Sequence, residues 1–185
     1  MKKIMKEMIN TGLYLLFLLC AVYLIITYVG QRTDVDGDSM KTTLYDGDSL
    51  IVDKLSYRFN EPERFDIIVF PFQYQENTFY IKRIIGLPGE TVQIDEKGNI
   101  YIDSGDGPEL LEESYGSEII KPEYIGRAIE PVKLGEDEYF VMGDNRNNSR
   151  DSRDSIVGNI KRKDIIGKAW VRIGPLERFG VLTHQ

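Results

Sequence analysis

The run from Leu13 to Val29 limits most strongly what this chain can become, because it contains no charged residue. As an α-helix at 1.5 Å per residue it covers about 26 Å. Met8 and Ile9 extend it toward the roughly 30 Å hydrocarbon core of a bilayer. The sequence therefore predicts a membrane-spanning helix, which we assign to residues 13–30.

Charged residues flank this run unevenly. Residues 1–12 contain Lys2, Lys3, Lys6 and one glutamate, so they carry a net charge of +2, whereas the whole chain carries −7 and the remainder −9. Loops rich in lysine and arginine stay on the cytoplasmic side of a membrane. We therefore expect residues 1–12 in the cytoplasm and residues 31–185 outside the cell membrane.

The alternative interpretation of the apolar run is a cleaved signal peptide. Such a peptide ends in small residues in an Ala-x-Ala-like pattern. The run here ends in Tyr28, Val29 and Gly30, with a bulky side chain where a small one is required. A retained anchor is therefore the favoured interpretation.

Two scarce residue types limit the possible chemistry. Cys20 is the one cysteine and His184 is the one histidine. No disulfide within the chain and no cysteine cluster for zinc is possible, and a histidine-based triad would require His184 to fold back into a site. A general base is therefore expected among Lys, Asp, Glu and Tyr.

The acidic body also argues against a nucleic-acid partner, which requires a basic face.

After Gly30 the pattern changes to short apolar stretches rich in β-branched and aromatic residues, separated by turn formers. These predicted strands are residues 49–53, 66–70, 80–85, 91–94, 99–102, 138–142 and 165–173. Residues 93–101 form a predicted hairpin around Asp-Glu-Lys-Gly-Asn. The predicted fold class is mainly β: a transmembrane helix followed by an antiparallel β-barrel or folded sheets.

Residues 104–131 differ from the rest of this body. They contain several glycines, prolines and glutamates and show weak periodicity. This composition predicts an inserted loop region or a small subdomain rather than part of the core.

The first segment with chemical potential reads Val-Asp-Gly-Asp-Ser-Met-Lys-Thr-Thr-Leu and covers residues 35–44. Gly37 allows a tight backbone, and the short polar residues around Ser39 favour a turn that exposes the hydroxyl. Taken alone, Ser39 is more often a structural turn residue in such a pattern.

The second segment places Lys82 in an apolar strand next to Ile81 and Ile84. Strand alternation puts Lys82 and Arg83 on opposite faces, so that one can point into the core while the other stays in solvent. Burial lowers the pKa of a lysine, and only the neutral amine can accept a proton from a serine. The alternative is an edge-strand lysine whose amine reaches solvent.

The third segment, residues 142–153, follows a predicted strand and is crowded with hydrogen-bonding groups. Ser149 can orient a lysine amine, as the third member of a triad orients its base. Asp144, Asp151, Arg146 and Arg153 are expected to form ion pairs that pin the loop. The alternatives are a solvated polar loop or a calcium loop, although the alternating arginines and the poor match to the Asp-x-Asp-x-Asp-Gly pattern weaken the calcium interpretation.

Together, and in this order behind a single span, these segments resemble the motif boxes of bacterial type I signal peptidases. Residues 37–40 resemble the nucleophile box, 64–70 a structural strand box, 80–89 the lysine box and 143–153 the final box. The resemblance extends from the anchor to about Trp170, apart from residues 104–131. Each box is moderately specific, and their combination is strong.

The resemblance implies a role for each matching side chain. Ser39 is the expected nucleophile and Lys82 the expected general base, with Ser149 hydrogen-bonded to the lysine. Expected structural residues near the site are Arg83, Asp151 and Arg153. The assignment depends on the Lys82 nitrogen lying within reach of the Ser39 oxygen.

Pocket residues follow from the same resemblance. The family binds small substrate residues at positions −1 and −3 in apolar pockets, for which the matching residues here are Val35, Met40, Leu44 and Ile81. Strand alternation would turn Ile81 away from Lys82, which puts its pocket role in doubt.

Two positions depart from the family pattern. Gly37 stands where some members carry a serine that adds a hydroxyl to the oxyanion hole, so the Ser39 backbone N–H is the remaining expected donor. Thr42 stands where the family usually carries proline, which predicts a less rigid loop after the nucleophile.

The resemblance implies a membrane-bound serine endopeptidase that removes signal peptides from exported preproteins, with no metal and no cofactor. Its expected partners are these preproteins, with pilin-type proteins as one candidate set, and the lipid bilayer. Two alternatives remain. A self-cleaving repressor protease shares the Ser–Lys chemistry but would carry a DNA-binding region instead of a span. A non-catalytic, membrane-tethered chaperone or assembly factor on the same scaffold should lack the serine or the lysine.

Overall fold

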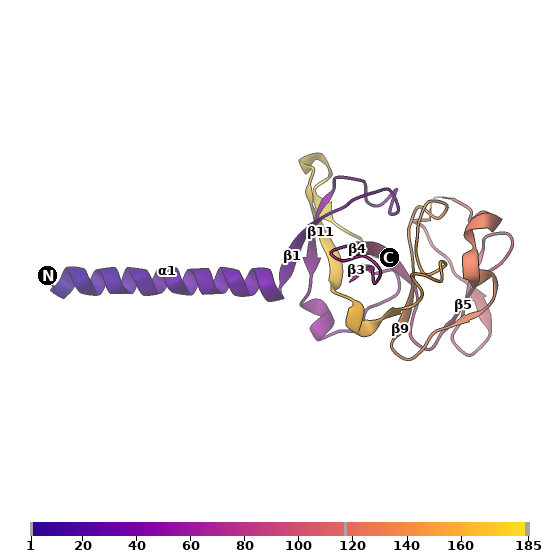
Figure 1. Ribbon diagram of the computed structural model, residues 1–185, viewed down its shortest axis with the longest axis horizontal. Coiled ribbons are helices and arrows are strands. Elements are labelled where there is room, and N and C mark those ends of the chain that lie inside the picture. Colours follow the sequence, from indigo (N-terminus) through magenta and orange to yellow (C-terminus); the bar gives the residue numbers. More distant parts are fainter. Residues whose placement is uncertain (1, 117, 184–185) are drawn as a thin grey trace.

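A long helix projects from a β-rich body in the computed structural model, which describes residues 2–116 and 118–183 (Figure 1). Helix α1 (Lys2–Tyr28) is long and apolar enough to cross a membrane over Lys3–Leu24. The helix begins well before the span that the sequence predicts, and it ends before Gly30, because Gly30 pairs with Asp53 in the first strand. His184 lies outside the described residues.

A large antiparallel sheet lies next to α1. Its strand order is β1-β2-β11-β3-β4-β9-β10, and β12 pairs separately with β11. The bounds are β1 (Gly30–Asp34), β2 (Ser49–Asp53), β3 (Ile67–Pro71), β4 (Phe79–Gly86), β9 (Glu138–Met142), β10 (Ile160–Lys161), β11 (Gly167–Gly174) and β12 (Gly180–Val181).

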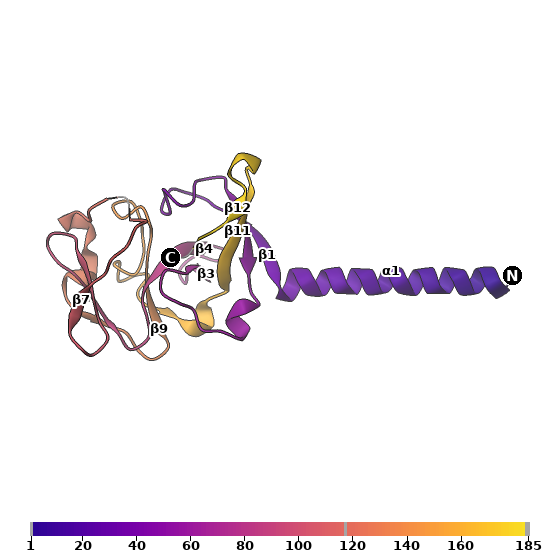
Figure 2. The ribbon, with the colours of Figure 1, turned by 180° about the vertical axis from the view of Figure 1, so that it is seen from behind.

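A smaller sheet forms the end of the body away from α1 (Figure 2). Its order is β7 (Pro108–Leu110), β6 (Ile100–Asp103), β5 (Thr91–Ile94) and β8 (Val132–Lys133). Short 3-10 helices connect the strands: η1 (Ser56–Arg58), η2 (Pro122–Tyr124), η3 (Gly126–Ile129), η4 (Arg162–Asp164) and η5 (Leu176–Arg178).

The predicted fold class, a long apolar helix followed by antiparallel sheets, is confirmed. Strands β2, β5 and β9 have the predicted bounds, and β5 and β6 form the predicted hairpin. The sequence analysis missed β1, whose residues Gly-Gln-Arg-Thr-Asp lack apolar alternation. Pairing with β2, rather than local propensity, makes this segment a strand.

The predicted exclusion of residues 104–131 from the core is wrong. Ile120, Ile125 and Ala128 are fully or almost fully buried, and they pack in one cluster with the apolar face of β5 and β6. The region therefore closes one side of the small sheet. Its apolar residues lie in irregular backbone and 3-10 turns, so they show no periodicity in the sequence.

Strand β4 has apolar cover on both faces. Ile84 belongs to a cluster with Ile68 and Val141, whereas the adjacent Ile85 belongs to the cluster under the small sheet. Because successive side chains of a strand point to opposite faces, this arrangement buries Lys82 and Arg83 together.

Candidate active site

Ser39 lies in a turn that directly follows Val35 and precedes a buried Met40. The turn requires Gly37, whose φ of +92° is in the left-handed region that favours glycine. The Gly37 N–H donates to Asp46 Oδ1 at 2.9 Å, which fixes the backbone before the serine.

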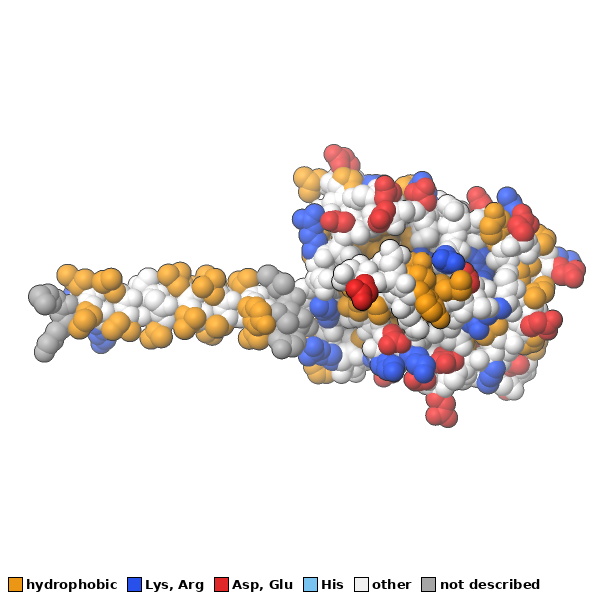
Figure 3. All heavy atoms as spheres, in the orientation of Figure 1, with side chains coloured by type: hydrophobic (Ala, Val, Ile, Leu, Met, Phe, Trp, Pro, Cys, Tyr) orange, Lys and Arg blue, Asp and Glu red, His pale blue; other side chains and the backbone are white. Residues whose placement is uncertain are grey.

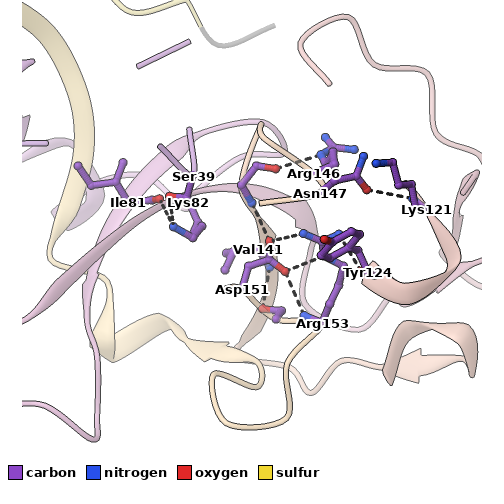
Figure 4. A network of polar contacts seen from close by, with 12 residues as sticks. Ser39, Ile81, Lys82, Lys121, Tyr124, Val141, Arg146, Asn147, Asp151 and Arg153 are labelled. Atoms are coloured by element: carbon purple, nitrogen blue, oxygen red, sulfur yellow. Dashed lines mark hydrogen bonds and ion pairs between the residues drawn. The ribbon is translucent and has the colours of Figure 1, made fainter. Parts of the chain in front are cut away.

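Lys82 reaches this turn from β4, and its Nζ lies 2.7 Å from Ser39 Oγ. The amine also donates to the Ile81 carbonyl at 2.9 Å, as Figure 4 shows. The lysine is only 4% exposed. Burial is the main reason why the pKa of Lys82 falls from 10.5 to about 8, since Asp151 and Asp144 oppose the shift.

Arg83 does not stay in solvent, contrary to the expectation from strand alternation. It is 1% exposed, and its Nε and Nη2 donate to the two oxygens of Asp144 at 2.9 and 2.7 Å. Residues far along the chain cover this face of β4, so alternation alone could not indicate its burial.

The loop of residues 143–153 packs against the nucleophile turn. The backbone N–H of Asn145 donates to the Ser39 carbonyl at 3.1 Å, and its side-chain amide donates to the Asp38 carbonyl at 3.0 Å. A Cβ on Gly143 would lie 2.4 Å from the Ser39 carbonyl oxygen and 2.3 Å from Ser149 Oγ. Only glycine therefore allows this close approach.

Asp151 and Arg153 form a buried ion pair inside this loop. The Arg153 guanidinium donates to both carboxylate oxygens at 2.8 Å, and it also reaches the Tyr124 carbonyl of region 104–131 (Figure 4). Burial alone would raise the pKa of Asp151, but the contacts with Arg153 hold it below its usual value.

Asp144 and Arg146 also form ion pairs that pin the loop, but with partners outside it. Asp144 pairs with Arg83, and Arg146 pairs with Glu113 of region 104–131. The charged residues of the loop therefore hold it to other elements, which the sequence could not indicate.

Ser149 is close to the Ser39 backbone but makes no hydrogen bond to Lys82. Its Oγ is buried, and among the described residues no partner meets normal hydrogen-bond geometry. The expected contact with the lysine is therefore not formed in this conformation.

A cleft of about 310 Å³ opens over Ser39 and Lys82. It is lined by residues 33–36, 39–40, 78–82 and 150. Val35, Met40 and Ile81 contribute to its walls, and Ile81 therefore faces the cleft despite the doubt raised by strand alternation. Leu44 does not line the cleft, because it is fully buried in the cluster behind Val35 and Met40.

Several residues around the site were missed by the sequence analysis. Thr43 donates a hydrogen bond to Asp144, Asn145 holds the Ser39 backbone, and Arg150 lies on the cleft wall. Asn145 and Arg150 stand in the polar segment that the sequence did single out, but their partners lie in other segments.

Comparisons with known proteins identify the family of the chain. Residues 8–173 match the family model described as signal peptidase, peptidase S26. The chain is 39% identical over 164 residues to a probable signal peptidase I-2 of Synechocystis sp., covering 86% of this chain and 70% of that protein. It is 34% identical over 169 residues to signal peptidase I P of Bacillus subtilis subsp. natto, covering 89% and 88%.

Among solved structures, a signal peptidase I from Enterococcus faecalis is 34% identical, with a TM-score of 0.47. The match covers 59% of this chain and 97% of that one. On the family model and the two sequence relatives, the chain belongs to the signal peptidase I family (peptidase S26), serine endopeptidases that remove signal peptides from preproteins.

Proposed function

We propose that Ser39 is the nucleophile and Lys82 the general base of this signal peptidase. The observation that carries the proposal is the 2.7 Å distance between Lys82 Nζ and Ser39 Oγ in a buried position. Hydrogen-bond distance is what proton transfer requires. With a pKa of about 8, a substantial fraction of the amine is neutral in mildly alkaline solution.

The proposed reaction has two stages. Neutral Lys82 takes the Ser39 proton while the oxygen attacks the scissile carbonyl, and the lysine then returns the proton to the leaving amine. An acyl-enzyme on Ser39 remains. Lys82 next takes a proton from water, the hydroxide attacks the ester, and the proton returns to Ser39 Oγ as the acid product leaves.

The Ser39 backbone N–H is the proposed donor to the oxyanion. Among the described residues it has no hydrogen-bond acceptor, so it is available to a developing negative charge. The Gly37 N–H is unavailable because it donates to Asp46. Because residue 37 is glycine, that position provides no side-chain hydroxyl to assist this donor.

The cleft suits an extended substrate. Strand β9 pairs with β4 only from Arg83 onward, so within the described part of the chain residues 79–82 have no strand partner on that side. Residues 33–36 face this edge across the cleft, and an extended peptide can hydrogen-bond such an edge. We assign the recognition of small residues at −1 and −3 to Val35, Met40 and Ile81, with Leu44 supporting them from behind.

The proposed location is the outer surface of the cell membrane. The lysines in the first turns of α1 favour a cytoplasmic N-terminus, and apolar side chains lie along the helix (Figure 3). Phe59 and Trp170, which are 79% and 51% exposed, line an apolar groove of about 720 Å³ together with Val29 at the base of the helix. Aromatic rings in this position suit a membrane interface, where the signal peptide of an exported preprotein delivers its cleavage point.

The test is cleavage of a reporter preprotein by the full chain in phospholipid vesicles. Ser39→Ala and Lys82→Ala should each abolish cleavage with the fold intact. The matched controls are Ser155→Ala and Lys97→Ala, because both residues are exposed away from the site. Unchanged cleavage by either site variant would refute the assignment. A panel that adds pilin-type precursors would separate a general from a dedicated substrate set.

A further inference from the structure

The segment around Tyr115, within region 104–131, reaches the interior behind the active site. Its ring lies against two guanidinium groups, with the central carbon of Arg83 3.8 Å and that of Arg146 5.9 Å from the ring centroid. Phe65 packs edge-on against the same ring, with 5.2 Å between centroids. A cation held against the face of an aromatic ring is attracted by the ring's quadrupole.

Each of these two cations fixes one part of the 143–153 loop. Arg83 donates two hydrogen bonds to Asp144. Arg146 donates through Nε to the Gly143 carbonyl at 3.1 Å, and its Nη2 lies 2.6 Å from the carboxylate of Glu113. Tyr115 thus contacts both groups that hold the first two residues of the loop.

The start of this loop determines where Ser39 stands. Asn145, next to Asp144, donates its backbone N–H to the Ser39 carbonyl. Thr43, in the segment that follows the nucleophile, donates to Asp144 itself. A shift of Asp144 would therefore displace the nucleophile relative to Lys82, and small displacements lower catalytic rates strongly.

The Arg83–Asp144 pair also affects the pKa of Lys82, because Asp144 is one of the charged groups around the lysine. Asp151 and Asp144 raise the pKa of the lysine, Arg153 lowers it, and its amine lies 5.1 Å from the centroid of the Tyr80 ring. If the Arg83–Asp144 pair loosened, Asp144 would be less neutralised and water would enter. Both changes favour the charged amine and so raise its pKa.

We propose that Tyr115 is a positioning residue of the active site, whose ring, supported by Glu113, holds Arg83 and Arg146 so that the 143–153 loop keeps Ser39 against Lys82. Region 104–131 then takes part in catalysis without contacting the reacting atoms. This inference rests on the proposed Ser39–Lys82 chemistry.

The ring, rather than the hydroxyl, performs this role. Among the described residues the Tyr115 Oη is buried with no hydrogen-bond partner, and burial raises the pKa of the phenol above its usual range. Tyr115→Phe keeps the aromatic face and should behave as a rescue variant. Tyr115→Leu keeps an apolar side chain but removes the face on which the guanidinium groups rest.

The experiment measures kcat for reporter cleavage between pH 6 and 10, using the full chain in vesicles, together with thermal unfolding. Tyr115→Leu should lower kcat by about 10- to 10²-fold and move the midpoint of the pH profile upward by roughly half a unit or more. Tyr115→Phe should restore both values. Tyr101→Leu, a partly buried tyrosine of β6 in the small sheet, is the matched control and should keep the wild-type profile.

A lowered melting temperature for Tyr115→Leu with an unchanged kcat and midpoint would overturn the proposal, and so would a Tyr115→Phe variant as impaired as Tyr115→Leu. If Tyr115→Leu does not fold, Glu113→Gln replaces it. A lower kcat with a raised midpoint would support the proposal, and a wild-type profile would overturn it. Cleavage that persists in Ser39→Ala would instead refute the proposed function itself.

Discussion

Lys82 Nζ lies 2.7 Å from Ser39 Oγ, and the lysine that carries it is only 4% exposed. Burial makes the amine a weaker base but keeps more of it neutral near physiological pH. The fold supports this position by covering both faces of β4, and this cover also buries Arg83 against Asp144. The two buried side chains therefore have different roles: Lys82 is the proposed proton acceptor, and Arg83 holds Asp144 of the loop.

Catalysis should become faster as the pH rises through about 8. Below the pKa of Lys82 the amine is protonated and cannot take the Ser39 proton, whereas above it the neutral form predominates. A profile of kcat between pH 6 and 10 should therefore rise to a plateau with a midpoint near 8. A rate that stays level or declines between pH 6 and 9 would contradict Lys82 as the base.

Lys82→Met should stabilise the fold while it removes activity. The pKa of the lysine is about 8 when folded against an ordinary 10.5, so the unfolded chain binds the proton more tightly. The buried lysine therefore lowers the free energy of unfolding. This loss of stability is complete below pH 8 and disappears as the pH rises toward 10.5. We expect a gain of about 1–3 kcal/mol at pH 7, reduced by the lost hydrogen bonds.

Chemical denaturation at pH 7 and pH 10.5 measures this difference. Lys97→Met, at an exposed position of the β5–β6 hairpin, is the control and should show no such pH-dependent gain. A Lys82→Met variant that is less stable than wild type at pH 7 would show that the buried amine contributes net stability.

Ser149→Ala tests whether this hydroxyl orients the lysine during the reaction. Ser149 Oγ is buried, and no partner among the described residues meets normal hydrogen-bond geometry, although the hydroxyl helps to lower the pKa of Asp151; its removal should therefore cost little stability. If it contacts Lys82 in the reacting complex, kcat should fall about 10-fold or more. A wild-type kcat in Ser149→Ala would restrict this serine to a packing role.

Gly143→Ala should strongly lower activity by displacing the nucleophile, rather than by a contact between residue 143 and the substrate. The added Cβ would lie 2.4 Å from the Ser39 carbonyl oxygen, which must move and displace the nucleophile. We expect a loss of about 10²-fold in kcat. Gly180→Ala is the control, because a Cβ there meets no atom within 4 Å and its φ is not in the left-handed region. Equal activity of the two variants would contradict the close approach.

Local patterns predicted much of the fold because β-branched runs bounded by turn residues define strands such as β2 and β5. The segments that hold Ser39 and Lys82 were likewise apparent, since the chemistry depends on residue type and order. Partners across the chain could not be predicted. Neither the pairing of Arg83 with Asp144 nor the burial of Ile120 leaves a local pattern.

The same limit applies to Tyr115 and Leu44. An isolated tyrosine among glutamates gives no sign that two arginines will lie against its ring. Leu44 belongs to the segment that lines the cleft, but only packing decides that it lies behind the wall. Contacts between segments far apart in the sequence therefore determine the surroundings of Tyr115 and the burial of Leu44, so neither could be predicted.

The most direct test of activation by Lys82 is the rate at which a serine-reactive covalent probe labels Ser39, located by mass spectrometry of the modified peptide. Wild type should be labelled at Ser39, with a rate that increases through pH 8, and Lys82→Met should react at least about 10²-fold more slowly. Labelling of Lys82→Met at the wild-type rate, or labelling of another serine in the wild type, would contradict the account.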